Sequence, residues 1–241
     1  MFARPVDFAE ALRLIAEPDA RVLAGGTDVF PAAGDRPLAG SYVDVTALPA
    51  LCGIKSESDW LRIGAAVTWS DIVKADLPPA FAALQAAARE VGGVQIQNRG
   101  TIAGNRRTAR ARDEIMTAVL VPQQPPTARS SFLKLGARRY LVISIVMVAV
   151  LLDSADGIVR GARVAVGACS AVAKRLPDVE RRLVGAPASA GLGNRVGPQH
   201  LAALSPIDDL RASAAYRHDA ALTLVRRAID LCLDKKAGGV C

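Results

Sequence analysis

Apolar residues recur at two different spacings along the chain, and these spacings separate predicted helices from predicted strands. Phe8, Ala11, Leu12 and Ile15 repeat every three or four residues behind Asp7, a favourable N-cap, so a helix is expected over 8–17. The same reasoning predicts further helices beginning at Thr68 and spanning 80–91, 177–184, 200–204 and 213–233. Apolar runs predict strands over 21–23, 42–45, 114–121, 132–137, 143–152 and 158–169, and a hairpin made of 52–55 and 60–65.

The order of these elements predicts an α+β fold with two domains. The polar, proline-rich segment 123–128 is the best candidate for a boundary, which gives domains over 1–125 and 126–241. In the second domain, Asp153 to Gly157 should turn a hairpin, so a small antiparallel sheet packed against helices is expected there.

Composition narrows the functional classes. Hydrophobic residues make up 51% of the 241 residues, so a sizeable core can be buried, whereas aromatic residues are only 4%, so that core is built from small aliphatic side chains. The net charge of +7 comes from scattered basic residues without a nucleic-acid-binding motif, so binding to nucleic acid is not expected. A phosphate-containing cofactor or an acidic partner subunit explains the charge equally well.

The cysteines and the apolar runs indicate a cytoplasmic protein. No two of the four cysteines form a CxxC pair, which argues against a zinc or iron–sulfur site in this chain and gives no sign of a disulfide framework. The longest apolar run, 143–152, is too short to cross a bilayer. Metal-binding residues are therefore not expected, and His200 and His218, on or beside predicted helices, are assigned surface or capping roles.

Two glycine-containing loops carry the candidate chemistry. Ala24-Gly25-Gly26-Thr27-Asp28 follows a predicted strand, and consecutive glycines allow several backbone N–H groups to line one concave side, where phosphate oxygens can bind. Asp28 is expected to cap a short helical turn beyond this loop. The second loop is Asn98-Arg99-Gly100-Thr101-Ile102-Ala103-Gly104-Asn105, with its candidate binding residues at Thr101 to Asn105. Each loop alone could be an ordinary tight turn, and neither is a Walker or a Rossmann motif.

Taken together and in order, the motifs resemble the FAD-binding medium subunits of molybdenum hydroxylases, the xanthine dehydrogenase and carbon monoxide dehydrogenase flavoprotein family. The resemblance runs from the AGGTD loop through Arg62-Ile63-Gly64-Ala65 to the second loop. It continues through Phe132-Leu133-Lys134-Leu135 and 209–217. It implies a flavin domain of the vanillyl-alcohol-oxidase type followed by the family's C-terminal domain.

The resemblance also implies which residues contact FAD. The family's pyrophosphate-binding loops correspond to Leu23 to Phe30 and to Thr101 to Asn105. The individual positions are Leu23, Ala24, Gly25, Gly26, Thr27, Asp28, Val29, Phe30, Thr101, Ile102, Ala103, Gly104 and Asn105. Further family contacts fall on Val91, on Ile115 or the adjacent Met116, and on Lys134. Val91 and Ile115 could instead be ordinary core residues, and Lys134 could be a solvated strand lysine.

In this family the medium subunit transfers electrons and does not bind the substrate. A large molybdopterin-binding subunit oxidises the substrate, a small subunit with 2Fe-2S clusters relays the electrons, and FAD passes them to an external acceptor. The resemblance therefore implies a dimer of heterotrimers, with no general base or nucleophile in this chain.

The sequence departs from the family pattern after Asn105. Arg106-Arg107-Thr108-Ala109-Arg110 resembles a segment that family members carry tens of residues later, beyond an FAD-contacting aspartate and several strands of the second flavin subdomain. Either the chain has a true internal deletion, or two segments of a longer chain are joined here. A truncated subdomain would leave a sheet edge unpaired and part of the flavin pocket without walls.

The truncation keeps two alternative functions open. The chain could be a flavin-free scaffold that holds the other subunits of the same complex together. It could also be an unrelated phosphate-binding module that uses the first loop alone.

Overall fold

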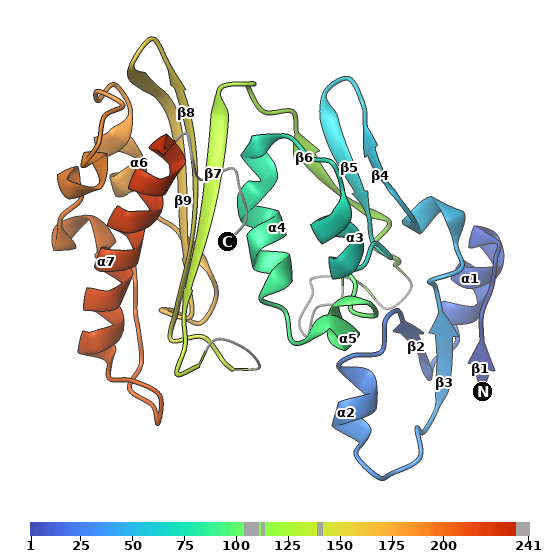
Figure 1. Cartoon of the computed structure of the whole chain (residues 1–241). Helices are drawn as coiled ribbons and strands as arrows, with labels where there is room; N and C mark the ends of the chain where they lie inside the picture. The colour runs from blue at the N-terminus through green and yellow to red at the C-terminus, as the bar shows by residue number, and fades with distance from the viewer. Residues whose placement is uncertain (104–110, 112–113, 139–141, 235–241) are drawn as a thin grey trace. The chain divides into compact units, whose positions relative to one another are not determined.

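The computed structural model describes residues 1–103, 111, 114–138 and 142–234, which belong to two compact units (Figure 1). The first unit comprises Met1–Ala75 and Val91–Gln123, and the second comprises Asp76–Glu90 and Gln124–Cys241. The chain therefore passes between the units three times, and each unit is described by itself below.

A small parallel sheet begins the first unit. Its strands β1 (Phe2–Ala3), β2 (Ala20–Leu23) and β3 (Ser41–Asp44) are arranged in the order β1-β3-β2. Helix α1 (Phe8–Ile15) begins where the sequence predicted, with the Asp7 carboxylate accepting a hydrogen bond from the N–H of Glu10 at 3.0 Å. Ala11 and Ile15 of α1 share a buried core with Val43. The predicted helix was two residues too long, because Ala16 is already the C-cap.

An antiparallel sheet completes the strands of this unit. Strands β4 (Ile54–Ser56), β5 (Trp60–Gly64) and β6 (Ala118–Pro122) lie in the order β4-β5-β6. The antiparallel pairing of β4 with β5 confirms the predicted hairpin. β6 begins four residues later than predicted, because Glu114 to Thr117 form no strand and the Glu114 carboxylate instead accepts a hydrogen bond from the N–H of Ala111. Within the part of the chain that the structure describes, β6 pairs only with β5 and forms a sheet edge.

Short helices connect these strands. α3 (Trp69–Lys74) starts at the predicted Thr68, which exchanges capping-box hydrogen bonds with Asp71. α2 (Val29–Ala33) is the short turn expected after the first loop, but the prediction that Asp28 caps it was wrong, because the Asp28 side chain makes no capping hydrogen bond. The sequence did not predict β1, the 3-10 helix η1 (Pro49–Leu51) or α5 (Val94–Gln97), all of which are short.

The second unit is built on a four-stranded antiparallel sheet. β7 (Ala128–Leu135), β8 (Val146–Ala155), β9 (Ile158–Gly167) and β10 (Lys174–Arg175) lie in the order β10-β9-β8-β7. The hairpin between β8 and β9 was predicted, and its two-residue turn consists of Asp156 and Gly157 at φ values of 53° and 73°. Two successive positive φ angles match the twist of the flanking strands, which is why Asp-Gly is favoured here.

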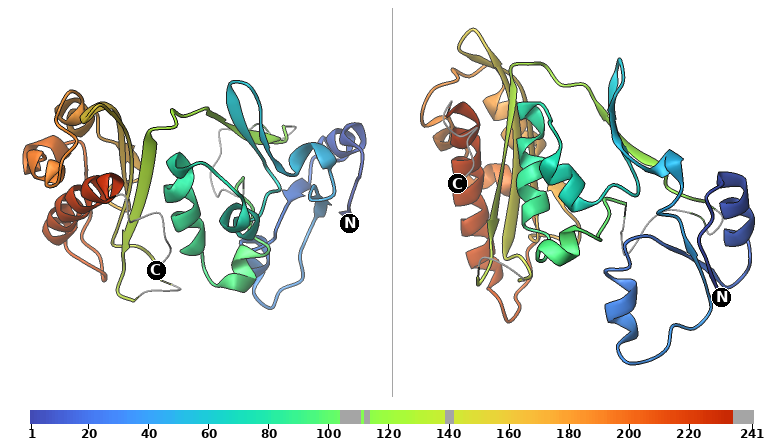
Figure 2. Two further views of the ribbon diagram at one scale, coloured as in Figure 1. Left: turned by 45° about the horizontal axis from the view of Figure 1, so that its top comes forward. Right: turned by 45° about the vertical axis from the view of Figure 1, so that its right-hand side comes forward.

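Helices α4 (Ala82–Arg89) and α7 (Ala214–Leu233) cover opposite faces of this sheet (Figures 1 and 2). Alternation along β7 shows the two faces: Ser130 accepts a hydrogen bond from the N–H of Ala83 beside α4, whereas Ser131 donates to the carbonyl of Ala228 in α7. The main core lies on the α7 side, where α6 (Pro177–Leu183) also packs.

The remaining helical turns of this unit are short. They are η2 (Pro79–Phe81), η3 (Leu192–Arg195) and η4 (Pro198–Leu201). The helix predicted over 200–204 was wrong, because the chain forms only the short 3-10 helix η4, which ends at Leu201. Among the described residues, no helix combines the length and the apolar character needed to cross a membrane.

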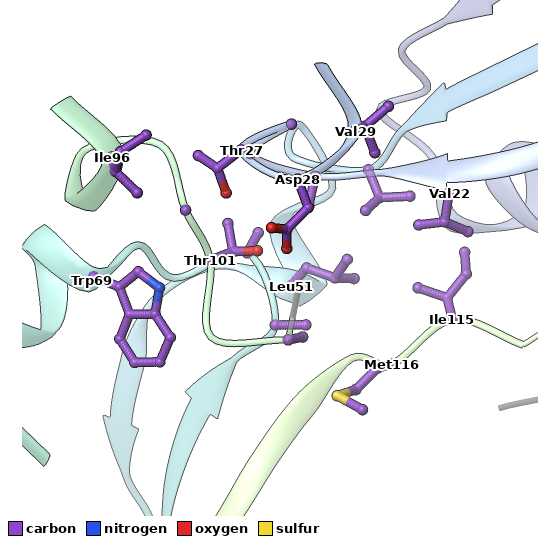
Figure 3. A pocket seen from close by; sticks show the side chains of 18 of the residues that line it. Val22, Thr27, Asp28, Val29, Leu51, Trp69, Ile96, Thr101, Ile115 and Met116 are labelled. Atoms are coloured by element: carbon purple, nitrogen blue, oxygen red, sulfur yellow. The ribbon is translucent and has the colours of Figure 1, made fainter. Parts of the chain in front are cut away.

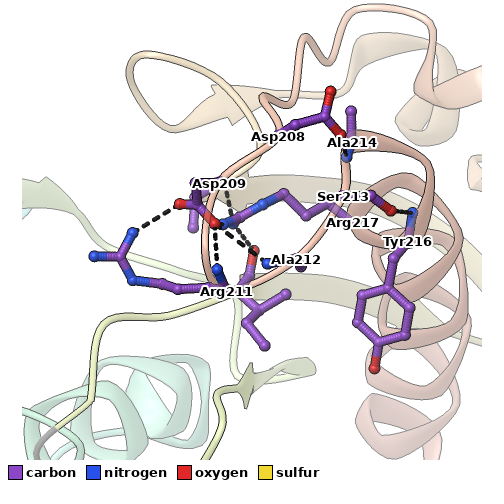
Figure 4. A network of polar contacts seen from close by, with 10 residues as sticks. Asp208, Asp209, Arg211, Ala212, Ser213, Ala214, Tyr216 and Arg217 are labelled. Carbon is purple, nitrogen blue, oxygen red and sulfur yellow. Dashed lines mark hydrogen bonds and ion pairs between the residues drawn. The ribbon is translucent and has the colours of Figure 1, made fainter.

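A buried arginine ties the start of α7 to the sheet (Figure 4). Only 3% of Arg217 is exposed, and its guanidinium donates hydrogen bonds to the carbonyls of Ile145 and Ala168 at 2.7 and 3.2 Å. It also donates to the Asp209 carboxylate at 2.7 Å. Because the charge of Arg217 is desolvated, these partners must be present for the unit to be stable.

We predict that Arg217→Met lowers the free energy of unfolding by roughly 3 kcal/mol, since it removes a buried, hydrogen-bonded ion pair and leaves two carbonyls without donors. Urea denaturation followed by circular dichroism measures this change. Arg211→Met is the matched control, because Arg211 binds the same carboxylate but is 40% exposed, and it should cost less than about 1 kcal/mol. Equal losses in both variants would contradict the assignment.

Acid should weaken the same network. The backbone N–H of Arg211, followed by the guanidinium of Arg217, holds the pKa of Asp209 well below its usual range. A carboxylate with a depressed folded-state pKa stabilises the fold above its unfolded pKa of about 3.9, and that stability is lost as pH falls towards the folded pKa. We therefore expect the unfolding free energy to fall more steeply below pH ~4 in the wild type than in Asp209→Asn. Identical pH profiles in denaturation experiments would refute this.

Candidate functional site

The first glycine loop lies in the first unit, directly after β2. Gly26 is a buried residue with a φ of 74°, a conformation that glycine adopts without steric cost. Within the described residues, the backbone N–H groups of Gly25, Gly26, Thr27 and Asp28 donate no hydrogen bond. The loop thus presents a run of consecutive donors, which is the arrangement that binds anions.

The second loop packs directly against the first. A Cβ atom on Gly25 would lie 1.7 Å from the carbonyl oxygen of Arg99, so only glycine permits this approach of the two backbones. A Cβ on Gly100 would lie 3.4 Å from the Thr27 hydroxyl. The two loops are therefore one structural element, although they are far apart in the sequence.

The start of α3 fixes the position of the second loop. The N–H of Trp69 donates to the carbonyl of Gly100 at 3.0 Å, and the N–H of Ile102 donates to the carbonyl of Val67 at 3.0 Å. Between them, Thr101 pairs with Thr68 in an antiparallel bridge and is only 5% exposed. The capping box that begins α3 thus also anchors the loop.

A cavity of about 450 Å³ opens beside the two loops (Figure 3). Thr27, Asp28 and Thr101 lie together at one part of its wall, and Ile115 and Met116 lie at another. Its volume falls within the ~300–1,000 Å³ typical of small-molecule sites. The cavity therefore combines hydrogen-bonding groups with an apolar surface.

Most of the site residues expected in the first unit line this cavity. They are Ala24, Gly25, Gly26, Thr27, Asp28, Val29, Val91, Thr101, Ala103 and Ile115. Leu23, Phe30 and Ile102 do not line it: Leu23 is 4% exposed in the core, and Phe30 is 53% exposed with its ring beside Gly26. Gly104 and Asn105 lie outside the described residues.

Lys134 belongs to the second unit and is not a lining residue. It lies on β7 with its side chain 10% exposed, and its ammonium is 3.5 Å from the carboxylate of Glu90. It also donates to the Glu90 carbonyl at 3.4 Å. The interpretation of Lys134 as a solvated strand lysine was therefore wrong.

Sequence reasoning missed about half of the lining residues. They are Val22, Val45, Leu51, Ala65, Ala66, Trp69, Ile96, Gly100, Glu114 and Met116, the last of which was named only as an alternative to Ile115. Most are small or aliphatic and resemble core residues in the sequence. Trp69 could have been noticed in the sequence, because a large aromatic residue stands directly after the capping residue Thr68, at the start of a predicted helix.

The electrostatics of the cavity are unusual for an anion site. Asp28 and Glu114 are its only charged lining residues within the described ranges, and both are acidic. An anionic ligand would therefore be held by backbone N–H groups and hydroxyls at short range, without a cationic side chain from the described lining.

The remaining candidate groups lie elsewhere. His200 belongs to the second unit and has the capping role that was expected, because its Nδ1 accepts a hydrogen bond from the N–H of Gly197 at 2.8 Å. Among the described residues, no three His, Cys, Asp or Glu side chains are grouped so that they could hold a metal ion.

Comparison with protein families places both parts of the chain. Residues 1–124 match the FAD binding domain in molybdopterin dehydrogenase, and residues 131–231 match the CO dehydrogenase flavoprotein C-terminal domain. The nicotine 6-hydroxylase medium subunit of Paenarthrobacter nicotinovorans is 29% identical over 273 positions that cover 95% of each chain. The carbon monoxide dehydrogenase medium chain of Hydrogenophaga pseudoflava is 32% identical over 105 residues, which is 42% of this chain and 37% of the relative.

Solved structures show the same fold. A carbon monoxide dehydrogenase from Hydrogenophaga pseudoflava aligns with a TM-score of 0.85 at 22% identity, covering 96% of each chain. Quinoline 2-oxidoreductase from Pseudomonas putida 86 aligns with a TM-score of 0.86 at 20% identity, covering 98% of this chain and 97% of the other. With a family model matched over more than half of its residues, this chain belongs to the FAD-binding medium subunits of the molybdopterin hydroxylases, the family of the carbon monoxide dehydrogenase and xanthine dehydrogenase flavoproteins.

Proposed function

We propose that this chain binds FAD in the cavity beside its two glycine loops and serves as the electron-transfer subunit of a molybdenum-containing hydroxylase. The run of N–H groups from Gly25 to Asp28, which have no partner among the described residues and belong to a loop that lines the cavity, is the observation that carries the proposal. When bound, the isoalloxazine ring supplies the redox chemistry, and the protein supplies binding and orientation.

The loops would hold the pyrophosphate. The positive φ of Gly26 is typical of loops whose successive N–H groups bind one anion, and the hydroxyls of Thr27 and Thr101 can add donors. Val91 and Ile115 supply apolar surface in the same cavity. Lys134, on the second unit, stays a predicted FAD contact that rests on the family resemblance.

The partner subunits follow from family membership. We propose a large molybdopterin-binding subunit that oxidises the substrate and a small 2Fe-2S subunit that relays electrons to this chain, assembled as a dimer of heterotrimers. The electrons then pass to an external acceptor. The relatives are subunits of enzymes named for nicotine, xanthine and carbon monoxide. We propose that the large subunit determines which substrate this complex oxidises.

A second candidate function is that of a flavin-free scaffold in the same complex. The alignment with the nicotine 6-hydroxylase subunit is 273 positions long, 32 more than the whole chain, so at least 32 positions are gaps in this chain. We place them after Asn105, where the second flavin subdomain of the vanillyl-alcohol-oxidase type is truncated. The lost wall would weaken FAD binding without removing the loops.

Cofactor analysis of the native complex separates the two functions. We expect acid precipitation to release FAD in about equimolar amount with this chain, identified by chromatography and by its absorbance spectrum. Molybdopterin and iron in the same preparation show that the other subunits are present. A complete complex without releasable FAD would establish the scaffold role and overturn the leading proposal.

Gly25→Ala tests the loop geometry. Its methyl group would collide with the Arg99 carbonyl and force the loops apart, so we expect the dissociation constant for FAD to rise at least ~10-fold in equilibrium dialysis, which corresponds to about 1.4 kcal/mol. Gly93→Ala is the matched control in the same unit, because its methyl group would approach only the flexible side chain of Gln95, at 3.3 Å. Unchanged FAD affinity in a folded Gly25→Ala chain would argue against pyrophosphate binding at this loop.

A further inference from the structure

Trp69 is the one aromatic side chain among the described residues that line the cavity. It is the first residue of α3, but the helix draws its packing from Ile72, which is fully buried, and its start from the Thr68 capping box. The indole itself is only partly buried. The folding of α3 thus gives no reason for a large aromatic ring at this position.

The second loop holds the indole in place. The N–H of Trp69 donates to the carbonyl of Gly100, and a Cβ atom on Gly100 would lie 3.1 Å from the indole Cδ1, so the ring rests against the bare backbone of the loop. In Figure 3 the indole nitrogen lies on the side of the cavity, and within the described part of the chain its N–H has no acceptor. Tryptophan N–H groups in partly buried positions usually find a hydrogen-bond partner, and a ligand in the cavity would supply an acceptor that the described residues do not.

The surroundings of Trp69 define what could bind beside it. Thr27 and Thr101 provide hydroxyls near the loops, and Met116 and Ile115 provide an apolar wall away from them. Methionine sulfur and aliphatic groups pack well against aromatic rings. A ligand that carries both a phosphate group and a flat ring could therefore satisfy the N–H groups and the apolar wall at once.

We propose that Trp69 forms an aromatic subsite of the cavity, which takes a planar nitrogen heterocycle that carries hydrogen-bond acceptor atoms. This inference rests on the proposed binding of FAD. FAD contains two such groups, the isoalloxazine ring and adenine, and both could stack on the indole or accept its N–H.

Affinity measurements on the full chain test the subsite. We expect Trp69→Leu to raise the dissociation constant for FAD about 10-fold, in the range of a lost aromatic contact. Trp69→Phe keeps a ring but no donor and should recover part of the affinity. Trp60→Leu is the matched control, because Trp60 is 40% exposed on β5 of the same unit and does not line the cavity.

Separate titrations with ADP and riboflavin identify the heterocycle. If adenine contacts Trp69, Trp69→Leu weakens the binding of ADP as much as that of FAD. If the isoalloxazine ring contacts Trp69, the substitution weakens the binding of FAD and riboflavin and leaves that of ADP unchanged. Either result supports the subsite.

Nuclear magnetic resonance provides a readout that a purely structural role would not move. The chain has two tryptophans, hence two indole N–H signals, which Trp60→Phe assigns. FAD should shift the Trp69 signal through its ring current and leave the Trp60 signal in place. This titration uses the wild-type chain, so it tests the subsite even if the Trp69→Leu variant does not fold.

The failure of the subsite and the failure of FAD binding are distinguishable. A wild-type chain that binds none of FAD, ADP and riboflavin refutes the proposed function and the subsite with it. FAD binding with an unmoved Trp69 signal, and with unchanged affinity in the Trp69 variants, refutes the subsite alone.

Discussion

The contact between the backbone at Gly25 and the carbonyl of Arg99 is the constraint on which the candidate site depends. No side chain fits between the two loops, since even a Cβ atom would overlap the carbonyl oxygen. Because the loops touch through their backbones, the hydrogen bonds that anchor the second loop to Val67 and Trp69 also position the first. One glycine thus joins the end of β2, the second loop and the start of α3 into a single wall of the cavity.

The unpaired N–H groups of the first loop give this wall its chemical character. Leaving a donor without a partner costs about 1–3 kcal/mol where water is excluded, and Gly26 is buried. Since Asp28 and Glu114 are the charged residues of the described lining, no side chain of that lining attracts an anion by a positive charge. The site would therefore select its ligand through short, directed hydrogen bonds, which suits a pyrophosphate held in one orientation and disfavours a loosely bound counter-ion.

Local patterns in the sequence predicted the elements well, because caps and periodicity act over a few residues. Asp7, Thr68 and Ser213 begin their helices as predicted, and the Asp156-Gly157 turn forms the expected hairpin. The start of β6 was misplaced, because the Glu114 side chain makes a local hydrogen bond to the N–H of Ala111 that the apolar pattern does not reveal. Each glycine loop was weak evidence alone, and only their order along the chain assigned them to FAD binding. Val45 and Leu51 were not assigned to the site, because an apolar residue that lines a cavity has the same sequence pattern as one in the core.

Because this chain lacks positions that its relatives have, it could be either a flavin carrier or a flavin-free scaffold, and the structure bears on that choice. A subunit that only held its neighbours together would need a stable fold, for which the buried Arg217 network and the core beneath α7 suffice. It would have no need of four consecutive N–H groups that lack partners within the described residues, nor of a tryptophan beside the cavity whose N–H has no acceptor there either. A ligand that accepts hydrogen bonds and carries a flat ring would pair with both. Even if the chain has a true deletion after Asn105, contacts within the first unit hold the first loop and the start of α3 in place beside the cavity.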